Sequence, residues 1–113
     1  MTKYKIVWTT KFKKDLKLAK KQNKDLNKLD YVINILIQGK ELDAKYQDHS
    51  LTGIYKEYRE CHIDPDWFLI YKKDDDKIVI IMLRLGSHSN LFEKQKTTRL
   101  NKKQLPPATI NTD

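Results

Sequence analysis

Three histidines carry most of the chemistry that this sequence offers near neutral pH. His49, His62 and His88 all fall between residues 46 and 92, a stretch that also holds two acidic clusters and three strand-like runs. Histidine is the side chain whose ordinary titration range lies closest to neutrality. Because the sequence has no recognisable metal-ligand motif, any reaction would depend on side-chain acids and bases.

Residue spacing disfavours two other kinds of site. No two histidines lie four residues apart, as they do in a zinc-binding helix, and there is no CxxC motif. Cys61 and His62 are adjacent, so on a strand they point to opposite faces and cannot pair as nucleophile and base. We therefore expect no metal and no other cofactor, with a metal site assembled in space as the alternative.

An antiparallel meander would bring the distant candidates together. Tight hairpins would place His62, Asp66 and the segment from Arg84 to His88 on one side of a sheet. The loop that carries His49 can fold over the same side of the sheet. RNA cleavage needs a base for the ribose 2′-hydroxyl, an acid for the departing 5′-oxygen and a cation for the charge on the phosphorane. A neighbouring aromatic ring supplies a stacking surface for a base.

Size and charge limit the class of protein. The chain has 113 residues and a net charge of +8, which predicts one domain with a polyanionic partner: nucleic acid, an acidic protein or an anionic membrane surface. No apolar run approaches the roughly 20 residues that span a bilayer, and the N-terminus lacks a signal-peptide core. A single cysteine, Cys61, cannot form an internal disulfide. We expect a cytoplasmic protein.

The first half of the chain predicts a short strand and two helices. Apolar residues alternate from Tyr4 to Trp8, and helical spacing follows from Thr10 to about Gln22 and from Lys24 to Gln38. Thr9 or Thr10 is the expected cap, Asn23 a stop, and Gly39 the end of the second helix. The outer face of the first helix is rich in lysine: Lys11, Lys13, Lys14, Lys17, Lys20 and Lys21. This face is either ordinary solvated surface or a contact to RNA phosphates.

The second half predicts an antiparallel meander. After a loop over residues 40–53, strand-like runs cover 54–62, 66–72 and 77–85, with acidic reversals between them. The run from Ile78 to Leu83 is so apolar that we place it in the middle of the sheet. The predicted fold is α+β in the order β-α-α-β-β-β, with two antiparallel helices packed on a twisted, mainly antiparallel sheet and a short C-terminal element.

Three separated motifs resemble the YafQ branch of the RelE/ParE toxin superfamily. They are His49-Ser-Leu-Thr-Gly53, the run from Tyr58 to Tyr71 (YRECHIDPDWFLIY), and the run from Arg84 to Phe92 (RLGSHSNLF). The resemblance implies a RelE-like toxin domain over residues 1–92. It does not cover residues 93–113, whose basic and polar composition predicts a flexible tail. It also implies a ribosome-dependent endoribonuclease that cuts mRNA in the ribosomal A site by metal-independent transesterification.

The resemblance also implies which residues act. His88 would be the general acid, and Asp66 or one of His49 and His62 the general base, while Arg84 would stabilise the scissile phosphate. Trp67 and Phe92 would shape the base pocket or stack on bases. We add two cations of the same segment as RNA-binding candidates, Lys56 and Arg59.

Each candidate also has a structural explanation. His49 and His62 can brace a loop or bond to backbone, Asp66 suits a turn, Arg84 can pair with an acid, and Trp67 and Phe92 can be core residues. Two departures bear on base preference: Ile54 and Tyr55 stand where relatives often have tryptophan, and Leu85 where threonine is common.

Two other function classes stay open on the sequence alone. One is a ParE-like inhibitor of DNA gyrase, and the other is a plain RNA-binding domain that uses its lysine-rich helices. The resemblance to the toxin superfamily implies a cognate antitoxin, the ribosome and mRNA as partners, and it implies no association with a membrane. It predicts a toxin that is monomeric alone and forms a hetero-oligomer with its antitoxin.

Overall fold

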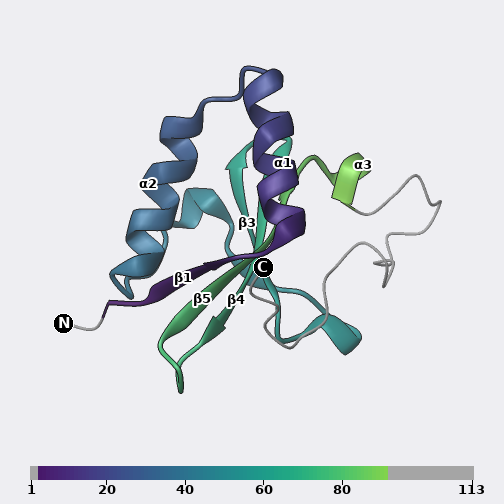
Figure 1. Ribbon diagram of the computed structural model, residues 1–113. Helices are drawn as coiled ribbons and strands as arrows, with labels where there is room; N and C mark the ends of the chain where they lie inside the picture. Colours follow the sequence, from purple (N-terminus) through teal and green to yellow (C-terminus); the bar gives the residue numbers. More distant parts are fainter. Residues whose placement is uncertain (1–2, 92–113) are drawn as a thin grey trace.

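The computed structural model describes residues 3–91, apart from the side chains of His88 and Asn90 (Figure 1). Phe92 and the expected tail at 93–113 lie outside the described residues. The strands are β1 (Lys5–Trp8), β2 (His49–Ser50), β3 (Arg59–Asp64), β4 (Trp67–Asp74) and β5 (Val79–Gly86). The helices are α1 (Thr10–Lys21), α2 (Leu26–Ile37) and α3 (His88–Leu91), with 3-10 turns η1 (Ala44–Tyr46) and η2 (Gly53–Tyr55).

The five strands form one mixed sheet in the order β1-β5-β4-β3-β2. Strands β3, β4 and β5 make the predicted antiparallel meander, and β1 pairs with β5 in parallel. β5, the most apolar strand, therefore lies between two neighbours, as predicted. The α+β fold is confirmed, and the element order matches the prediction apart from the added short strand β2.

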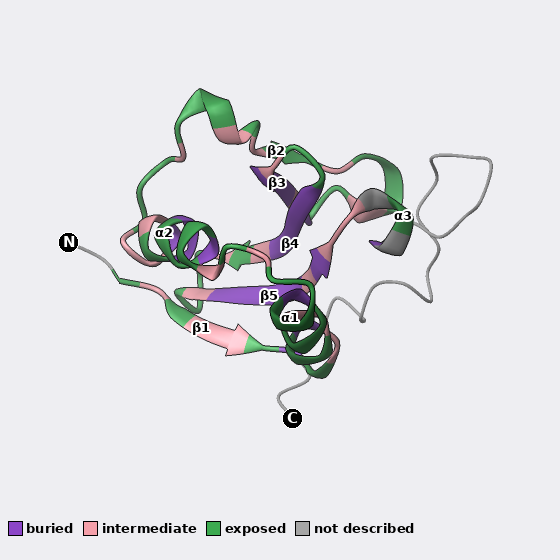
Figure 2. Cartoon of the chain, turned by 90° about the horizontal axis from the view of Figure 1, so that it is seen from above, coloured by how far each residue is buried: buried purple, intermediate pink, exposed green. Residues whose placement is uncertain are grey.

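The two faces of the sheet carry separate cores. Helices α1 and α2 pack on one face, where Phe12 and Val32 meet Leu69 and Met82 of the sheet. We call it the helix-covered face. Alternate residues point to the second face, where Phe68 packs with neighbours from β5 and α3. Figure 2 shows that burial is concentrated in the central strands and on the inward sides of the two helices.

Local signals end the helices where the sequence predicts. The Thr9 side chain accepts a hydrogen bond from the Phe12 N–H at 3.1 Å and donates one to the Met82 carbonyl oxygen at 2.8 Å. This cap therefore also fastens α1 to β5. Asn23 and Gly39 follow the two helices with positive φ values of 58° and 73°, a conformation that stops a helix.

Two predictions about residues 40–62 are wrong. The expected loop at 40–53 contains η1 and β2, and the strand expected at Ile54 begins only at Arg59. Gly53 has a φ of 66° and starts a tight turn, in which the Lys56 N–H bonds to the Gly53 carbonyl oxygen. The apolar residues Ile54 and Tyr55 imitate a strand in the sequence, although this turn holds them in η2.

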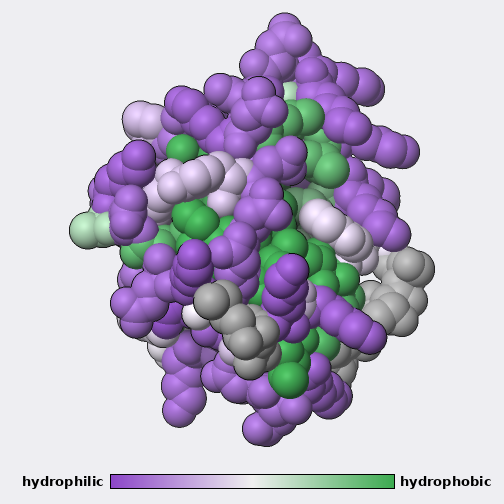
Figure 3. Space-filling model, turned by 90° about the vertical axis from the view of Figure 1, so that its left-hand side faces the viewer, coloured by the Kyte–Doolittle hydropathy of each residue, from purple (hydrophilic) through white to green (hydrophobic). Residues whose placement is uncertain are grey.

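The surface is largely hydrophilic. On the side formed by α2 and β1, polar residues surround a central band of hydrophobic residues (Figure 3). Within residues 3–91, no helix has the length and apolar character needed to cross a membrane.

Candidate active site

His49, Glu60 and His62 form a cluster on the second face of the sheet. His49 lies opposite Glu60 in the β2–β3 register, and His62 lies two residues further along β3. The Nε2 atom of His49 is 3.3 Å from Oε1 of Glu60, whose side chain is only 4% exposed. The two imidazole rings are 6.4 Å apart between centroids. Two titratable rings and a buried carboxylate thus share one small area.

The His49 ring is held between two oxygen atoms. Its Nδ1–H donates to the Gln47 carbonyl oxygen at 2.7 Å, and its Nε2 faces Glu60. Both ring nitrogens are therefore engaged within the protein.

Glu60 is the site residue that sequence reasoning missed. Glu60 lies two residues before His62, and side chains two apart on a strand point to the same face. This spacing is the signal in the sequence that could have identified it. The contact to His49 depends on the pairing of β2, which the sequence did not predict.

The fold brings the other candidates to one end of the sheet. His62 pairs with Phe68, and Phe68 pairs with Gly86, so one row across three strands leads from His62 to the start of α3 at His88. The His62 ring packs edge-on against Phe68, with centroids 4.4 Å apart. Asp66 lies in the exposed turn between β3 and β4 at this same end. The backbone positions therefore converge as the meander requires.

Arg84 is engaged by an acid. Its Nε and Nη2 atoms donate to the two oxygens of Asp15 at 2.8 and 3.2 Å, and both side chains are nearly buried. The same carboxylate accepts the Leu85 N–H at 2.9 Å. Arg84 thus fastens the end of β5 to α1, and Asp15 offsets the charge that we expected to act on the phosphate.

A second cation stands beside this pair. Lys11 has its pKa lowered, first because its ammonium is partly desolvated and then because Arg84 is close. Two cations therefore surround the single carboxylate of Asp15. Lys11, one of the lysines that the sequence marked as possible RNA contacts, therefore adds positive charge at this end of β5.

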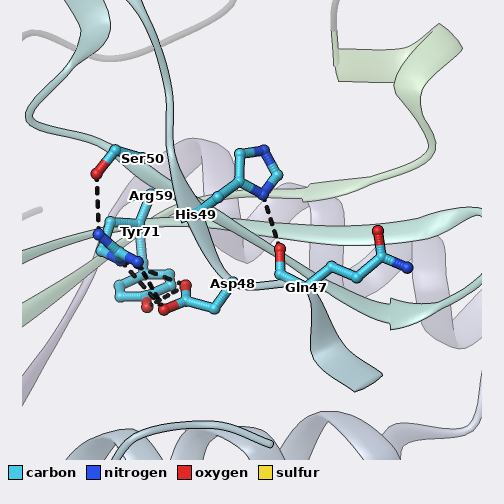
Figure 4. Close-up of polar contacts among 6 residues, drawn as sticks. All are labelled: Gln47, Asp48, His49, Ser50, Arg59 and Tyr71. Carbon is cyan, nitrogen blue, oxygen red and sulfur yellow. Dashed lines mark hydrogen bonds and ion pairs between the residues drawn. The ribbon is translucent and has the colours of Figure 1, made fainter. Parts of the chain in front are cut away.

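Arg59 braces the loop that carries His49. Its guanidinium donates to Asp48 and to Ser50 Oγ, and the hydrogen bond to Asp48 raises the pKa of Arg59. Tyr71 donates to the same carboxylate at 2.6 Å. Figure 4 shows Asp48 pointing toward Arg59 and Tyr71, while His49 points away from them. The expected RNA contact of Arg59 stays a prediction, and its guanidinium also has a use within the protein.

The stacking role expected for Trp67 is corrected by its burial. Its side chain is 1% exposed and belongs to the core beneath the helices, so no base can reach its ring. Lys56 is exposed just after η2 and keeps its position as a candidate cation. The roles expected for Phe92 and for the His88 side chain lie outside the described residues.

The arrangement is suited to proton transfer beside a polyanion. It combines two imidazoles with a buried carboxylate, which are groups that can move the protons of a transesterification at a phosphate. In the described part of the chain, no group of three or more histidine, cysteine, aspartate or glutamate side chains is placed to hold a metal ion.

Comparisons with known proteins match most of the chain. A family model described as "Bacterial toxin of type II toxin-antitoxin system, YafQ" covers residues 4–93. The chain is 44% identical over 88 residues to the mRNA interferase toxin YafQ of Escherichia coli K12. The aligned region covers 77% of this chain and 94% of that protein.

Solved structures agree. The E. coli DinJ-YafQ toxin-antitoxin complex contains a chain that superposes with a TM-score of 0.74 at 43% identity, covering 80% of this chain and 98% of that one. A metal-bound toxin from Helicobacter pylori gives a TM-score of 0.74 at 42% identity, covering 79% of this chain and 99% of that one.

Proposed function

Because the chain belongs to the YafQ family of bacterial toxins from type II toxin–antitoxin systems, we propose that it is an mRNA interferase that cleaves messages at the ribosome. One observation carries the proposal: the match to the family, over residues 4–93, spans the whole candidate site. The relative named an mRNA interferase is 44% identical, which favours cleavage over gyrase inhibition or plain RNA binding.

The proposed reaction is a metal-independent transesterification. His62 takes the proton from a ribose 2′-hydroxyl, and the 2′-oxygen forms a bond to phosphorus. His88 gives a proton to the 5′-oxygen as its bond to phosphorus breaks. The products are a 2′,3′-cyclic phosphate and a 5′-hydroxyl, so that no water or cofactor is consumed.

The contacts of the two imidazoles support this division of roles. Both nitrogens of His49 already face protein oxygens, so His49 is assigned to bind the substrate and not to act as the base. The side chains of His88 and Asn90 aside, no residue between 3 and 91 is hydrogen bonded to the His62 ring, which suits a general base. Asp66 is assigned to orient His62 or the substrate, and Arg84 to position the end of β5.

The basic face of α1 supports action at the ribosome. Six lysines and one acid occupy its 12 residues, and the acid, Asp15, is already paired with Arg84. α1 packs on the helix-covered face, whereas His49 and His62 lie on the second face. The lysines therefore suit a second RNA, which we propose to be ribosomal RNA, while the message occupies the site.

We also propose a cognate antitoxin as the partner in the cytoplasm. The YafQ chain of the DinJ complex is similar over nearly its whole length. A net charge of +8 favours an acidic or amphipathic antitoxin segment, which would form a hetero-oligomer with an otherwise monomeric toxin.

Mapping the ends of messages in translation reactions tests the function. The full chain should cut messages that ribosomes are reading and leave the same RNA intact without ribosomes. His88→Ala should lose about 10²–10⁴-fold in cleavage rate, as expected when a general acid is removed. Ser89→Ala, in the same short helix, is the matched control and should keep its activity.

Three results would contradict the proposal. They are DNA damage without message cleavage, equal cleavage of free RNA, and full activity in a folded His88→Ala protein. The first would support a gyrase inhibitor instead.

A further inference from the structure

A groove runs along the open edge of β3 and reaches the candidate site. Strand β2 pairs only with Arg59 and Glu60, so the remainder of β3 has η1 beside it in place of a strand. The groove between them has a volume of about 600 Å³. Lys28, Lys45 and Tyr46 line one part of it, and His62 lines another.

The walls of this groove combine an aromatic ring with cations. One side of Tyr46 packs on the core, and its ring lies 6.3 Å from that of Tyr31, which is 54% exposed. The ammonium of Lys45 stands 5.2 Å from the Tyr46 ring centroid, and Lys28 binds Asp64 at 2.7 Å. Rings that alternate with lysines are the recurrent means of holding single-stranded nucleic acid.

The turn at Gln47 connects the groove to the catalytic cluster. Gln47 follows η1 with a φ of 49°, a left-handed conformation uncommon outside glycine, and this reverses the chain between Tyr46 and His49. Its carbonyl oxygen holds the His49 ring, and the residue also lines the groove. A strand of RNA at His49 and His62 would therefore continue along η1.

We propose that this groove is a nucleotide subsite that holds the message next to the scissile phosphate. The neighbouring base stacks on Tyr46, and its phosphate binds Lys28 and Lys45. The inference rests on the proposed function and names the residues that bind its substrate.

The present contacts of the groove do not oppose this ligand. A stacked base interacts with a tyrosine ring more strongly than an exposed ammonium does, so Lys45 can move from the ring to the phosphate. The Lys28–Asp64 pair is exposed, and such pairs exchange partners readily.

Steady-state cleavage by the full chain in translation reactions tests the subsite. Tyr46→Leu keeps apolar contact with the core and removes the ring, so it should lower kcat/KM roughly tenfold, the usual effect of losing one stacked base. The loss should appear mainly in KM, and the preference for the base beside the cut should weaken. Tyr46→Phe should restore both, because it keeps the ring.

Variants that remove one lysine charge test phosphate binding in the groove independently of base stacking. Lys45→Gln should raise KM and reduce the dependence of KM on salt. Lys40→Gln removes the same charge from an exposed lysine outside the groove and should change neither. Thermal unfolding of each variant separates loss of binding from loss of the fold.

The outcomes separate this inference from the function itself. If the wild type cleaves and folded Tyr46→Leu cleaves equally well, the subsite is wrong and the function stands. The same holds if Tyr46→Leu cleaves normally but escapes neutralisation by the antitoxin, since the groove would then hold protein. If Tyr46→Leu does not fold, the comparison of Lys45→Gln with Lys40→Gln decides. If the wild type cuts no message, both proposals fail.

Discussion

The cluster of Asp48, Arg59 and Tyr71 allows a quantitative test of how the His49 loop is held. The Asp48 carboxylate accepts hydrogen bonds from the buried Tyr71 hydroxyl and from a guanidinium about one third exposed. Asp48→Ala leaves the hydroxyl buried without its acceptor, which costs about 1–3 kcal/mol. The partly exposed ion pair adds about 0–1 kcal/mol. We expect the free energy of unfolding to fall by about 3 kcal/mol.

The second substitution of the cycle separates packing from hydrogen bonding. In the wild type, Tyr71→Phe removes one charge-assisted hydrogen bond and should cost about 1.5 kcal/mol. In Asp48→Ala the same substitution removes a hydroxyl that is buried without an acceptor, so it should restore at least about 1 kcal/mol. The expected coupling energy is therefore at least about 2.5 kcal/mol.

Urea unfolding of the wild type, both single variants and the double variant measures this coupling. For a domain of this size, the loss in Asp48→Ala corresponds to a fall in Tm of about 15 °C, which calorimetry checks independently. Additive costs, within about 0.5 kcal/mol, would show that the two side chains do not depend on each other and would refute the role given to Asp48.

Four further predictions follow from the described contacts. Burial raises the pKa of the Cys61 thiol, so as pH rises the thiol loses its proton in the unfolded chain before it does so in the folded chain. The free energy of unfolding, measured by urea titration, should therefore fall as pH rises above about 9, and it should fall less in Cys61→Ala. Lys14→Gln with Lys17→Gln should reduce the salt slope of ribosome binding, by up to roughly 0.9 for each lost phosphate contact, measured by sedimentation. Trp67→Ala should cost about 3–5 kcal/mol by denaturant unfolding, whereas Trp67→Phe should keep cleavage because the ring is core and not a stacking surface. Toxin treated with a chelator and then desalted should cleave messages as before, and a loss that zinc or copper restores would disprove metal independence.

Local patterns in the sequence were sufficient for most of the fold. The helix ends follow from Thr9, Asn23 and Gly39, because a cap or a positive φ acts within a few residues. The meander follows from apolar runs separated by acidic turns, and the central position of β5 from its lack of charge. The family followed from three motifs in one order, and the comparison over residues 4–93 bears it out.

The contacts of the candidate site were decided by tertiary structure. Arg84 and Asp15 are 69 residues apart, and no local pattern says which acid an arginine at the end of a strand will meet. The burial of Trp67 depends on which face of the sheet the helices cover.

What the sequence by itself determined is therefore the elements, their order and the kinds of side chain that the site contains. Only the folded chain decided that Glu60 holds His49, that Arg59 braces a loop, and that η1 lies beside β3. The physical reason is range: propensity, capping and periodicity act over a few residues, whereas pairing between distant strands is chosen by the packing of the whole domain.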